Sequence, residues 1–266
     1  MAISAKDVMS LRQRTGLGMM ECKKALEESN GDADAAVEAL REKLKGKMDE
    51  RTDRDAGEGL VALAEGDGSV CMIEVNCETD FVARNDDFVD TVQKIAEAAL
   101  AGADGEVAAD AGITEQIDAL RISTKENVQF RRGVKLTGGL LGAYVHHNRR
   151  FGALVKGDGK IDAETLTGIC QHVVSHQPPP VGVAEEDLPA EQRDAAMAEA
   201  KQEAIDSGKP EEIAEKIATG KYRKWVGEHT LLGQKYVKDP DGKQTVGDAL
   251  GKNGKVECFV RFALGE

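Results

Sequence analysis

The spacing of apolar residues changes abruptly near Gly59, and this change constrains the fold more than any other feature of the chain. Before it, apolar residues recur at helical spacing in three short segments within residues 4–45. After it, Gly59–Glu65 and Ser69–Asn76 have the pattern of two strands, joined by the turn sequence Gly66-Asp67-Gly68. The chain therefore begins with a small helical domain and continues into a domain built on a β-hairpin.

The rest of the chain repeats the order strand, strand, helix. The patterns predict helices over 86–101, 114–125, 164–176 and 246–250, and strands over 127–136, 140–147, 151–156 and 256–264. The repeated order suggests two related subdomains of the α+β class, each with an antiparallel sheet.

A helical hairpin is expected inside the second subdomain. Pro189–Ser207 is rich in alanine, Gly208-Lys209-Pro210 ends one helix and starts another, and Glu211–Val226 forms the second arm. Two helices joined by a short turn run antiparallel, and the opposite charge bias of these arms favours their pairing. The predicted organisation is a three-helix domain over 1–45, a charged linker over 46–58, core subdomains over 59–137 and 138–266, and a hairpin inserted at about 186–228.

Composition excludes several classes of protein. Lys and Arg number 35 against 48 Asp and Glu, a net charge of −13, so no long basic surface for a nucleic-acid backbone is expected. Five cysteines without a CxxC pair argue against a disulfide framework or a zinc ribbon and for a reducing compartment. No apolar run approaches the length of a membrane helix and no secretory signal opens the chain, so a cytoplasmic protein is expected.

Motifs for catalysis and cofactor binding are absent from the sequence. It contains no GxxxxGK[ST] loop, no GxGxxG after a strand, no HExxH and no GxSxG. We therefore expect no enzymatic activity, no catalytic residue, no cofactor and no metal site. His172 and His176 share one face of a predicted helix, but no third ligand is visible, so capping or interface histidines are favoured over a metal-dependent enzyme.

The most distinctive local feature is EVNCETDFVARN, residues 74–85, where a strand ends and a helix begins. Thr79 and Asp80 are typical turn or capping residues, whereas Phe81 and Val82 are apolar residues on a polar connection. Two interpretations stay open from the residues alone. The one that the chemistry favours turns Phe81 inward to fix the loop to the core, and the other exposes Phe81 for insertion into a partner's pocket.

These motifs resemble those of the elongation factor Ts family, the bacterial guanine-nucleotide exchange factors of elongation factor Tu. ETDFVARN resembles the family's second signature, and its N-terminal signature resembles Leu11-Arg12, Thr15-Gly16, Met19-Met20 and Cys22-Lys23-Lys24-Ala25-Leu26. SGKPEEIAEK and the closing VRF are also similar, and the resemblance covers essentially the whole chain. It implies a ubiquitin-associated-like N-terminal domain, a linker, two core subdomains and a coiled-coil hairpin.

The resemblance implies a non-enzymatic factor that binds elongation factor Tu·GDP, promotes GDP release and stays bound until GTP enters. In the family, the loop that matches Thr79, Asp80, Phe81 and Val82 dislocates Mg²⁺ from the partner. Phe81 would be the wedge that enters an apolar slot, and Asp80 would hydrogen-bond to the partner and fix the approach.

Arg12, Met19, Met20 and Lys23 match the family's N-terminal binding surface. Neighbouring helical residues point about 100° apart, so one methionine of the pair can be in the core and the other exposed; packing and partner binding stay open for each. The basic and acidic residues of 1–45 are equal in number, which allows docking on a charged partner.

The implied partner is elongation factor Tu, with no direct nucleic acid and no membrane, and a two-to-two complex is known in parts of the family. Some relatives continue past the last strand with a helix that contacts elongation factor Tu, whereas this sequence stops at Gly265-Glu266. We therefore expect that contact to be absent or replaced. The alternative is a scaffold that holds the same partner without exchanging its nucleotide.

Overall fold

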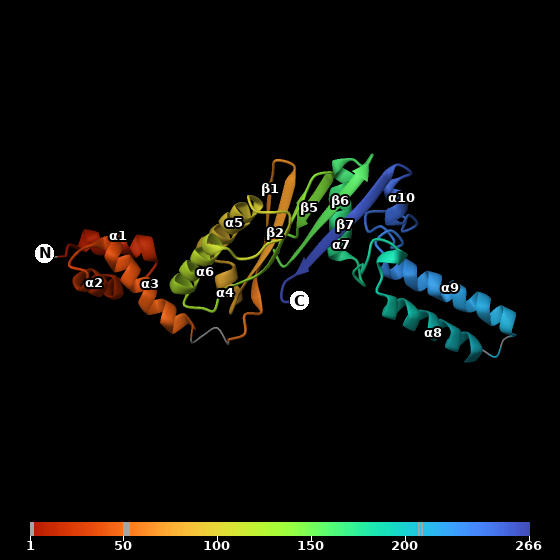
Figure 1. Ribbon diagram of the computed structural model, residues 1–266, viewed down its shortest axis with the longest axis horizontal. Coiled ribbons are helices and arrows are strands. Elements are labelled where there is room, and N and C mark those ends of the chain that lie inside the picture. The colour runs from red at the N-terminus through yellow and green to blue at the C-terminus, as the bar shows by residue number, and fades with distance from the viewer. Residues whose placement is uncertain (1–2, 50–53, 207, 209) are drawn as a thin grey trace. The chain divides into compact units, whose positions relative to one another are not determined.

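The computed structural model describes residues 3–49, 54–206, 208 and 210–266, and the chain forms two compact units. Unit 1 comprises Met1–Lys135 and Phe262–Glu266, and unit 2 comprises Leu136–Arg261. Each unit combines helices with an antiparallel β-hairpin, which confirms the predicted α+β class (Figure 1). The last five residues group with unit 1, whereas the sequence analysis assigned them to the subdomain 138–266.

Three helices open unit 1: α1 (Ala5–Thr15), α2 (Met19–Glu28) and α3 (Ala33–Asp49). Ser4 caps α1 through a capping box with Asp7, as its sequence position predicts. Buried apolar side chains from all three helices and from the connection between α1 and α2 form the core of this bundle: Val8, Leu11, Leu17, Cys22, Ala25, Leu26, Ala36 and Leu40. Residues 46–49, expected in the linker, continue α3, and residues 50–53 lie outside the described residues.

The sheet of unit 1 has the strand order β1-β2-β4-β3. Its strands are β1 (Glu58–Gly66), β2 (Ser69–Cys77), β3 (Gly105–Glu106) and β4 (Gln129–Thr137). Asp67 and Gly68, with φ of 51° and 67°, form the two-residue turn between β1 and β2, as the glycine-rich sequence predicts. The two-residue strand β3 was not predicted, because so short a segment carries no periodic signal.

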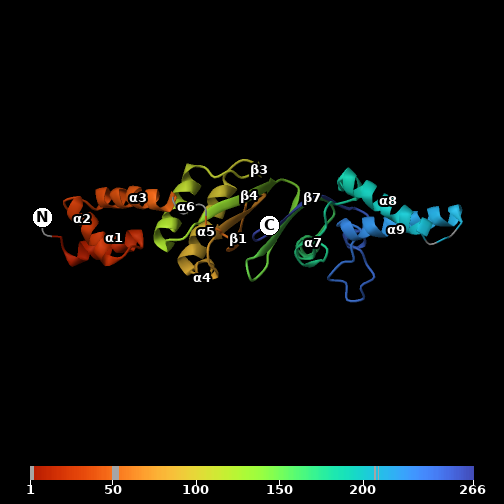
Figure 2. The ribbon, with the colours of Figure 1, turned by 90° about the horizontal axis from the view of Figure 1, so that it is seen from below.

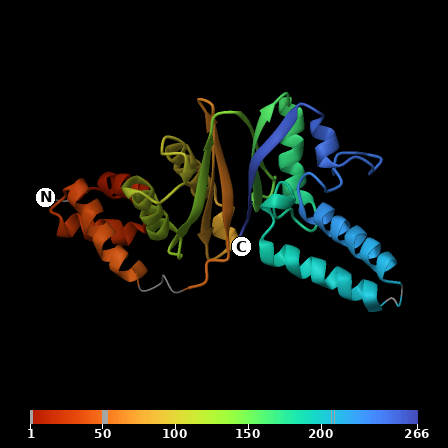
Figure 3. The ribbon, with the colours of Figure 1, turned by 45° about the vertical axis from the view of Figure 1, so that its right-hand side comes forward.

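Two helices cover one face of this sheet: α5 (Asp86–Leu100) and α6 (Ala111–Thr124). They are the yellow to yellow-green helices beside β1 and β2 in Figure 3. Alternate residues of β1 and β2 meet the apolar stripe of α5, including Phe88, Val92 and Ile95, to form the core of the unit.

Unit 2 has a sheet of order β5-β6-β7. Its elements are β5 (Leu140–Val145), β6 (Phe151–Gly159), α7 (Ala163–Ser175), η1 (Glu185–Asp187), α8 (Ala190–Asp206), α9 (Glu211–His229), α10 (Val246–Leu250) and β7 (Gly254–Ala263). Helix α7 packs on the sheet through Leu166, Ile169 and Val173, which are buried against β6 and the chain after α9.

Helices α8 and α9 run side by side in opposite directions (Figures 1 and 2). Four small side chains are buried between them: Ala200, Ala204, Ala214 and Ala218. Lys221 pairs with Glu203 across the helices, so opposite charges do meet on facing edges. Within the described residues, no helix is both long and apolar enough to span a membrane.

Residues 262–266 are held at the first sheet by an ion pair between a buried carboxylate and a partly exposed arginine. Arg132 Nε lies 2.7 Å from Glu74 Oε2, and Glu74 is completely buried. The other Glu74 oxygen accepts a hydrogen bond from Gly265 N at 3.0 Å, and Arg132 donates to Ala263 O at 3.0 Å. The guanidinium also lies over the Phe262 ring at 4.3 Å, so one ion pair holds the end of the described chain.

Candidate partner-binding site

The predicted loop is an ordered turn rather than an irregular connection. Strand β2 ends at Cys77, and Asp80–Ala83 forms the single-turn helix α4. Thr79 caps it: its backbone is extended and its Oγ1 accepts a hydrogen bond from Val82 N at 3.4 Å. Asn85 then caps α5 by accepting from the amides at the start of that helix. Two caps within seven residues thus fix the path of the chain.

Phe81 points into solvent and is 83% exposed, the largest exposed fraction among the exposed large apolar side chains of the described residues. The inward-facing interpretation is therefore wrong. Val82 and Ala83 take the inward positions and pack against the core of the sheet, and successive helical residues point about 100° apart, which leaves Phe81 outward. The core contact that was expected of Phe81 is made by its neighbours.

Asp80 lies beside Phe81 and is partnered within the turn. Its Oδ2 is 3.0 Å from Arg84 Nη2, and the two side chains are 43% and 80% exposed. An ion pair so open to water contributes only about 0–1 kcal/mol, so Asp80 can exchange Arg84 for a donor on a partner at little cost.

Glu126, which the sequence analysis did not single out, anchors the turn from the other side. Its Oε2 accepts hydrogen bonds from Glu78 N and Thr79 N, both at 3.1 Å, and its Oε1 accepts from Thr79 Oγ1 at 2.6 Å. Because 47 residues separate Thr79 from Glu126, nothing in the local sequence signals this contact.

Cys77 is a core residue that contacts the same turn through its thiol. It is completely buried, and its Sγ donates to Thr79 O at 3.2 Å. Burial first, and then the nearby Glu126 carboxylate, raise the pKa of the thiol to about 12, so the thiol stays protonated and unreactive.

The four N-terminal site residues all lie on the surface of the bundle. Arg12 and Lys23 are exposed, and Lys23 forms a loose pair with Glu27 at 3.8 Å. Met19 is 40% exposed and Met20 is 76% exposed. The core interpretation is therefore wrong for both methionines, because Cys22, Ala25 and Leu26 fill the inward face of α2.

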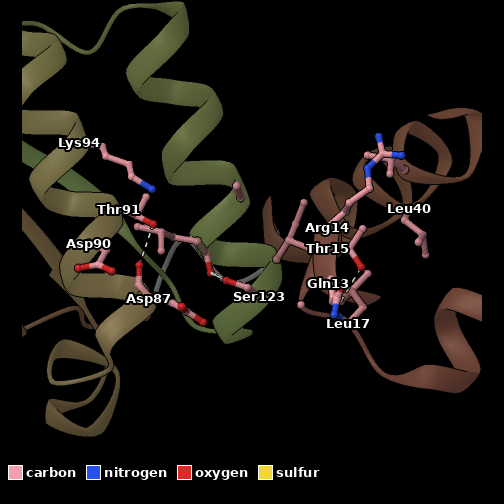
Figure 4. Close-up of a pocket in the computed structure, with 15 residues that line it drawn as sticks. Gln13, Arg14, Thr15, Leu17, Leu40, Asp87, Asp90, Thr91, Lys94 and Ser123 are labelled. Atoms are coloured by element: carbon pink, nitrogen blue, oxygen red, sulfur yellow. Dashed lines mark hydrogen bonds between the residues drawn. The ribbon is translucent and has the colours of Figure 1, made fainter. Parts of the chain in front are cut away.

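The C-terminal end of α6 joins the bundle to the rest of unit 1. Ile122 is buried in the core of the bundle, and Lys125 Nζ lies 3.7 Å from Glu21 Oε2. A cleft of about 470 Å³ opens between the bundle and helices α5 and α6 (Figure 4). Figure 4 shows Asp87, Asp90 and Lys94 on its α5 side, but none of the eight predicted site residues lines it.

His172 lies on α7 as predicted, whereas His176 follows the helix as its C-cap residue with an extended backbone. His172 serves the fold. It is completely buried, with Nε2 3.0 Å from Gln234 Oε1, and its Nδ1 accepts from Val237 N at 3.3 Å. Burial lowers the pKa of His172 to about 4. Across the residues that the structure describes, no group of three or more His, Cys, Asp or Glu side chains is arranged to hold a metal ion.

Comparison with known proteins gives a consistent result. The sequence profile of one family, Elongation factor TS, matches residues 78–266. The chain is 44% identical to Elongation factor Ts of Thioalkalivibrio sulfidiphilus and 42% identical to that of Alkalilimnicola ehrlichii, and each alignment covers 100% of this chain and 93% of the relative. Identity to Elongation factor Ts of Vibrio cholerae is 38%, with the same coverage.

Proposed function

The chain belongs to the elongation factor Ts family, and from this premise we propose that it binds elongation factor Tu·GDP and accelerates GDP release. Such a factor is not an enzyme and needs no nucleotide site of its own. It has to bind the nucleotide-free partner more tightly than the nucleotide-bound one, and linkage then requires that it weaken nucleotide binding by the same factor. Every 1.4 kcal/mol of differential contact changes nucleotide affinity about tenfold.

The exposure of Phe81 on a capped turn is the observation that carries the proposal. An aromatic ring held in water gains about 2 kcal/mol when an apolar slot takes it up, so the turn is suited to insertion. Asp80 sits next to the ring with only an exposed partner and can orient the insertion by accepting a hydrogen bond.

Displacement of Mg²⁺ is the proposed route from insertion to release. Mg²⁺ and GDP stabilise each other on such a partner because the ion neutralises phosphate charge. An insertion through Thr79–Val82 that moves the ion's ligands removes this support, and the carboxylate of Asp80 adds electrostatic competition near the ion. GTP entry then restores the ion and releases the factor.

A second contact through the bundle is proposed for Arg12, Met19, Met20 and Lys23. Their exposure on one small domain supports this, as methionine side chains adapt well to a partner surface. We propose that this domain is ubiquitin-associated-like, that nucleic acid and membranes are not partners, and that the protein acts in the cytoplasm. The sequence does not specify the two-to-two complex known in parts of the family, and the mass of the assembled complex tests for it.

The test is the rate of GDP release from elongation factor Tu, followed by stopped flow with fluorescent GDP at fixed Mg²⁺. The Phe81→Ala variant should fold normally, since the ring makes little contact with the rest of the chain, and should slow release at least about tenfold. Val181→Ala, at a partly exposed apolar residue in unit 2, serves as the control and should leave release unchanged.

A folded Phe81→Ala variant with wild-type release would remove the wedge role. A stable complex in which even the wild-type chain does not accelerate release would identify a holding partner instead of an exchange factor. Chelation of Mg²⁺ before mixing separates the mechanisms: the acceleration should shrink if displacement of the ion is the main step.

A further inference from the structure

Two carboxylates tie the turn after β2 to the turn after α6 in a reciprocal way. Glu126 accepts hydrogen bonds from the backbone amides of Glu78 and Thr79 and from the Thr79 hydroxyl. In return, Glu78 Oε1 accepts from Asn127 N at 2.7 Å. Each segment thus uses its acidic side chain to satisfy backbone donors of the other, and we refer to Glu78 and Glu126 as the carboxylate clamp.

The clamp determines the direction of the Thr79 hydroxyl. Since the hydroxyl donates to Glu126 at 2.6 Å, a lone pair of its oxygen is left for Val82 N at the start of α4. The same hydroxyl therefore accepts a hydrogen bond from the Val82 amide and donates one to the Glu126 carboxylate. The cap of α4, and with it the direction in which Phe81 leaves the chain, depends on the anchor across the turn.

The position of Glu126 is itself constrained. Lys125 has a left-handed backbone with φ of 62°, which ends α6, and its amide closes the helix on Arg121 O at 2.9 Å. Glu126 follows immediately and is partly buried, so its carboxylate is delivered to the turn by the helix end rather than by a flexible loop.

We infer that Glu126 is a positioning residue for exchange: it holds Asp80 and Phe81 in the orientation for insertion without itself entering the partner. The inference rests on the proposed function. Because the clamp already orders the turn in the free protein, little conformational entropy is lost when the partner binds. The clamp therefore lowers the entropic cost of inserting Phe81. Without Glu126, three donors of the turn bond to water instead and α4 samples other orientations.

The first test uses the isolated protein and needs no partner. Amide hydrogen exchange over residues 78–83 should become about tenfold faster in Glu126→Ala, while the amides of the β1–β2 core keep their protection. Glu126→Gln, which keeps one carbonyl acceptor of the same shape, should show a smaller increase. Glu97→Ala, at an exposed position on α5, is the matched control and should change nothing.

The second test measures GDP release from elongation factor Tu with the same variants. Glu126→Ala should lower the maximal acceleration at least about fivefold, with Glu126→Gln between it and the wild type. If Glu126 acts through Phe81, the double variant Glu126→Ala/Phe81→Ala should be no slower than Phe81→Ala alone, which distinguishes positioning from a general structural defect.

Unchanged hydrogen exchange in Glu126→Ala, unchanged release, or losses that multiply in the double variant would each overturn the inference. If Glu126→Ala fails to fold, Glu126→Gln decides by the same criteria. If the wild-type chain does not accelerate GDP release, the proposed function is wrong. The hydrogen-exchange test on the isolated protein then still decides whether Glu126 orders the turn.

Discussion

Among single residues, His172 is the titratable side chain whose protonation the fold constrains most clearly. The Val237 amide donates to Nδ1, so the proton of the neutral ring is on Nε2 and points to Gln234 Oε1. Gln234 in turn donates to Pro178 O at 3.0 Å and to Glu228 O at 2.8 Å. A second proton on the imidazole would displace the Val237 amide, and burial opposes the charge.

Stability should therefore fall in mild acid. The folded-state pKa of His172 is lowered from 6.5 to about 4, first by burial and then by the nearby His176, so the unfolded chain binds the proton more readily. The stabilisation is present above pH 6.5 and is lost as the pH falls from 6.5 to about 4. The free energy of unfolding, measured with urea, should be about 2–3 kcal/mol lower at pH 4.5 than at pH 7 because of His172 alone.

Two variants isolate the contribution of His172. His172→Gln should unfold with a much flatter pH dependence over this range, whereas His147→Gln, at an exposed histidine, should keep the wild-type slope. An equal slope in all three proteins would assign the acid sensitivity to other groups.

At the scale of elements, the helical hairpin is held by small side chains more than by charge. Ala204, 1% exposed, and Ala218 lie in the seam between α8 and α9 and present only a methyl group there. The ion pair of Lys221 with Glu203 lies in solvent, with about half of each side chain exposed. Close packing of the seam therefore decides the distance between the helices, and the pair adds about 0.2–1 kcal/mol.

Overfilling the seam should loosen the hairpin. Ala204→Leu should destabilise it by about 1–3 kcal/mol, because the added atoms separate the helices. Ala198→Leu places the same change on the exposed side of α8 and should be nearly neutral. Hydrogen exchange of the α8 and α9 amides is the measurement, and equal protection in both variants would contradict tight packing of the seam.

At the scale of the whole molecule, the ion pair of Glu74 with Arg132 connects residues distant in sequence. Gly265 donates to Glu74 across 191 residues, and Arg132 donates to Ala263 across 131. The pair thus holds residues 262–266 within unit 1.

Breaking one side of this pair should be costly. Arg132→Met leaves the Glu74 carboxylate buried without a counter-charge and should lower the free energy of unfolding by about 3–5 kcal/mol. Glu74→Gln/Arg132→Met removes both charges and should recover a large part of the loss. Thermal unfolding of each variant is the measurement. In it, Arg14→Met, which breaks an exposed pair with Asp34, should lower the free energy of unfolding by under about 1 kcal/mol. Failure of the double variant to recover stability would show that the aromatic and backbone contacts of Arg132 dominate.

Much of the fold follows from local patterns. The three N-terminal helices, the turn at Asp67-Gly68 and the helices α8 and α9 all have local sequence signals, which lie within a few residues of each other. The end of α3 was not predicted, because its last turn contains Gly46 and charged residues that are typical of a linker. The turn residues Thr79–Val82 were also identified from local sequence, through capping residues and a family signature.

The sequence by itself determined the order and type of most elements, because periodicity, caps and turn residues act over short distances. Only the tertiary structure decided which way side chains face. Phe81 and Val82 are neighbours with similar apolar character, and their directions depend on what already fills the core beside them. Glu126 became part of the site only when folding brought the end of α6 to the end of β2, since a contact across 47 residues has no local signature.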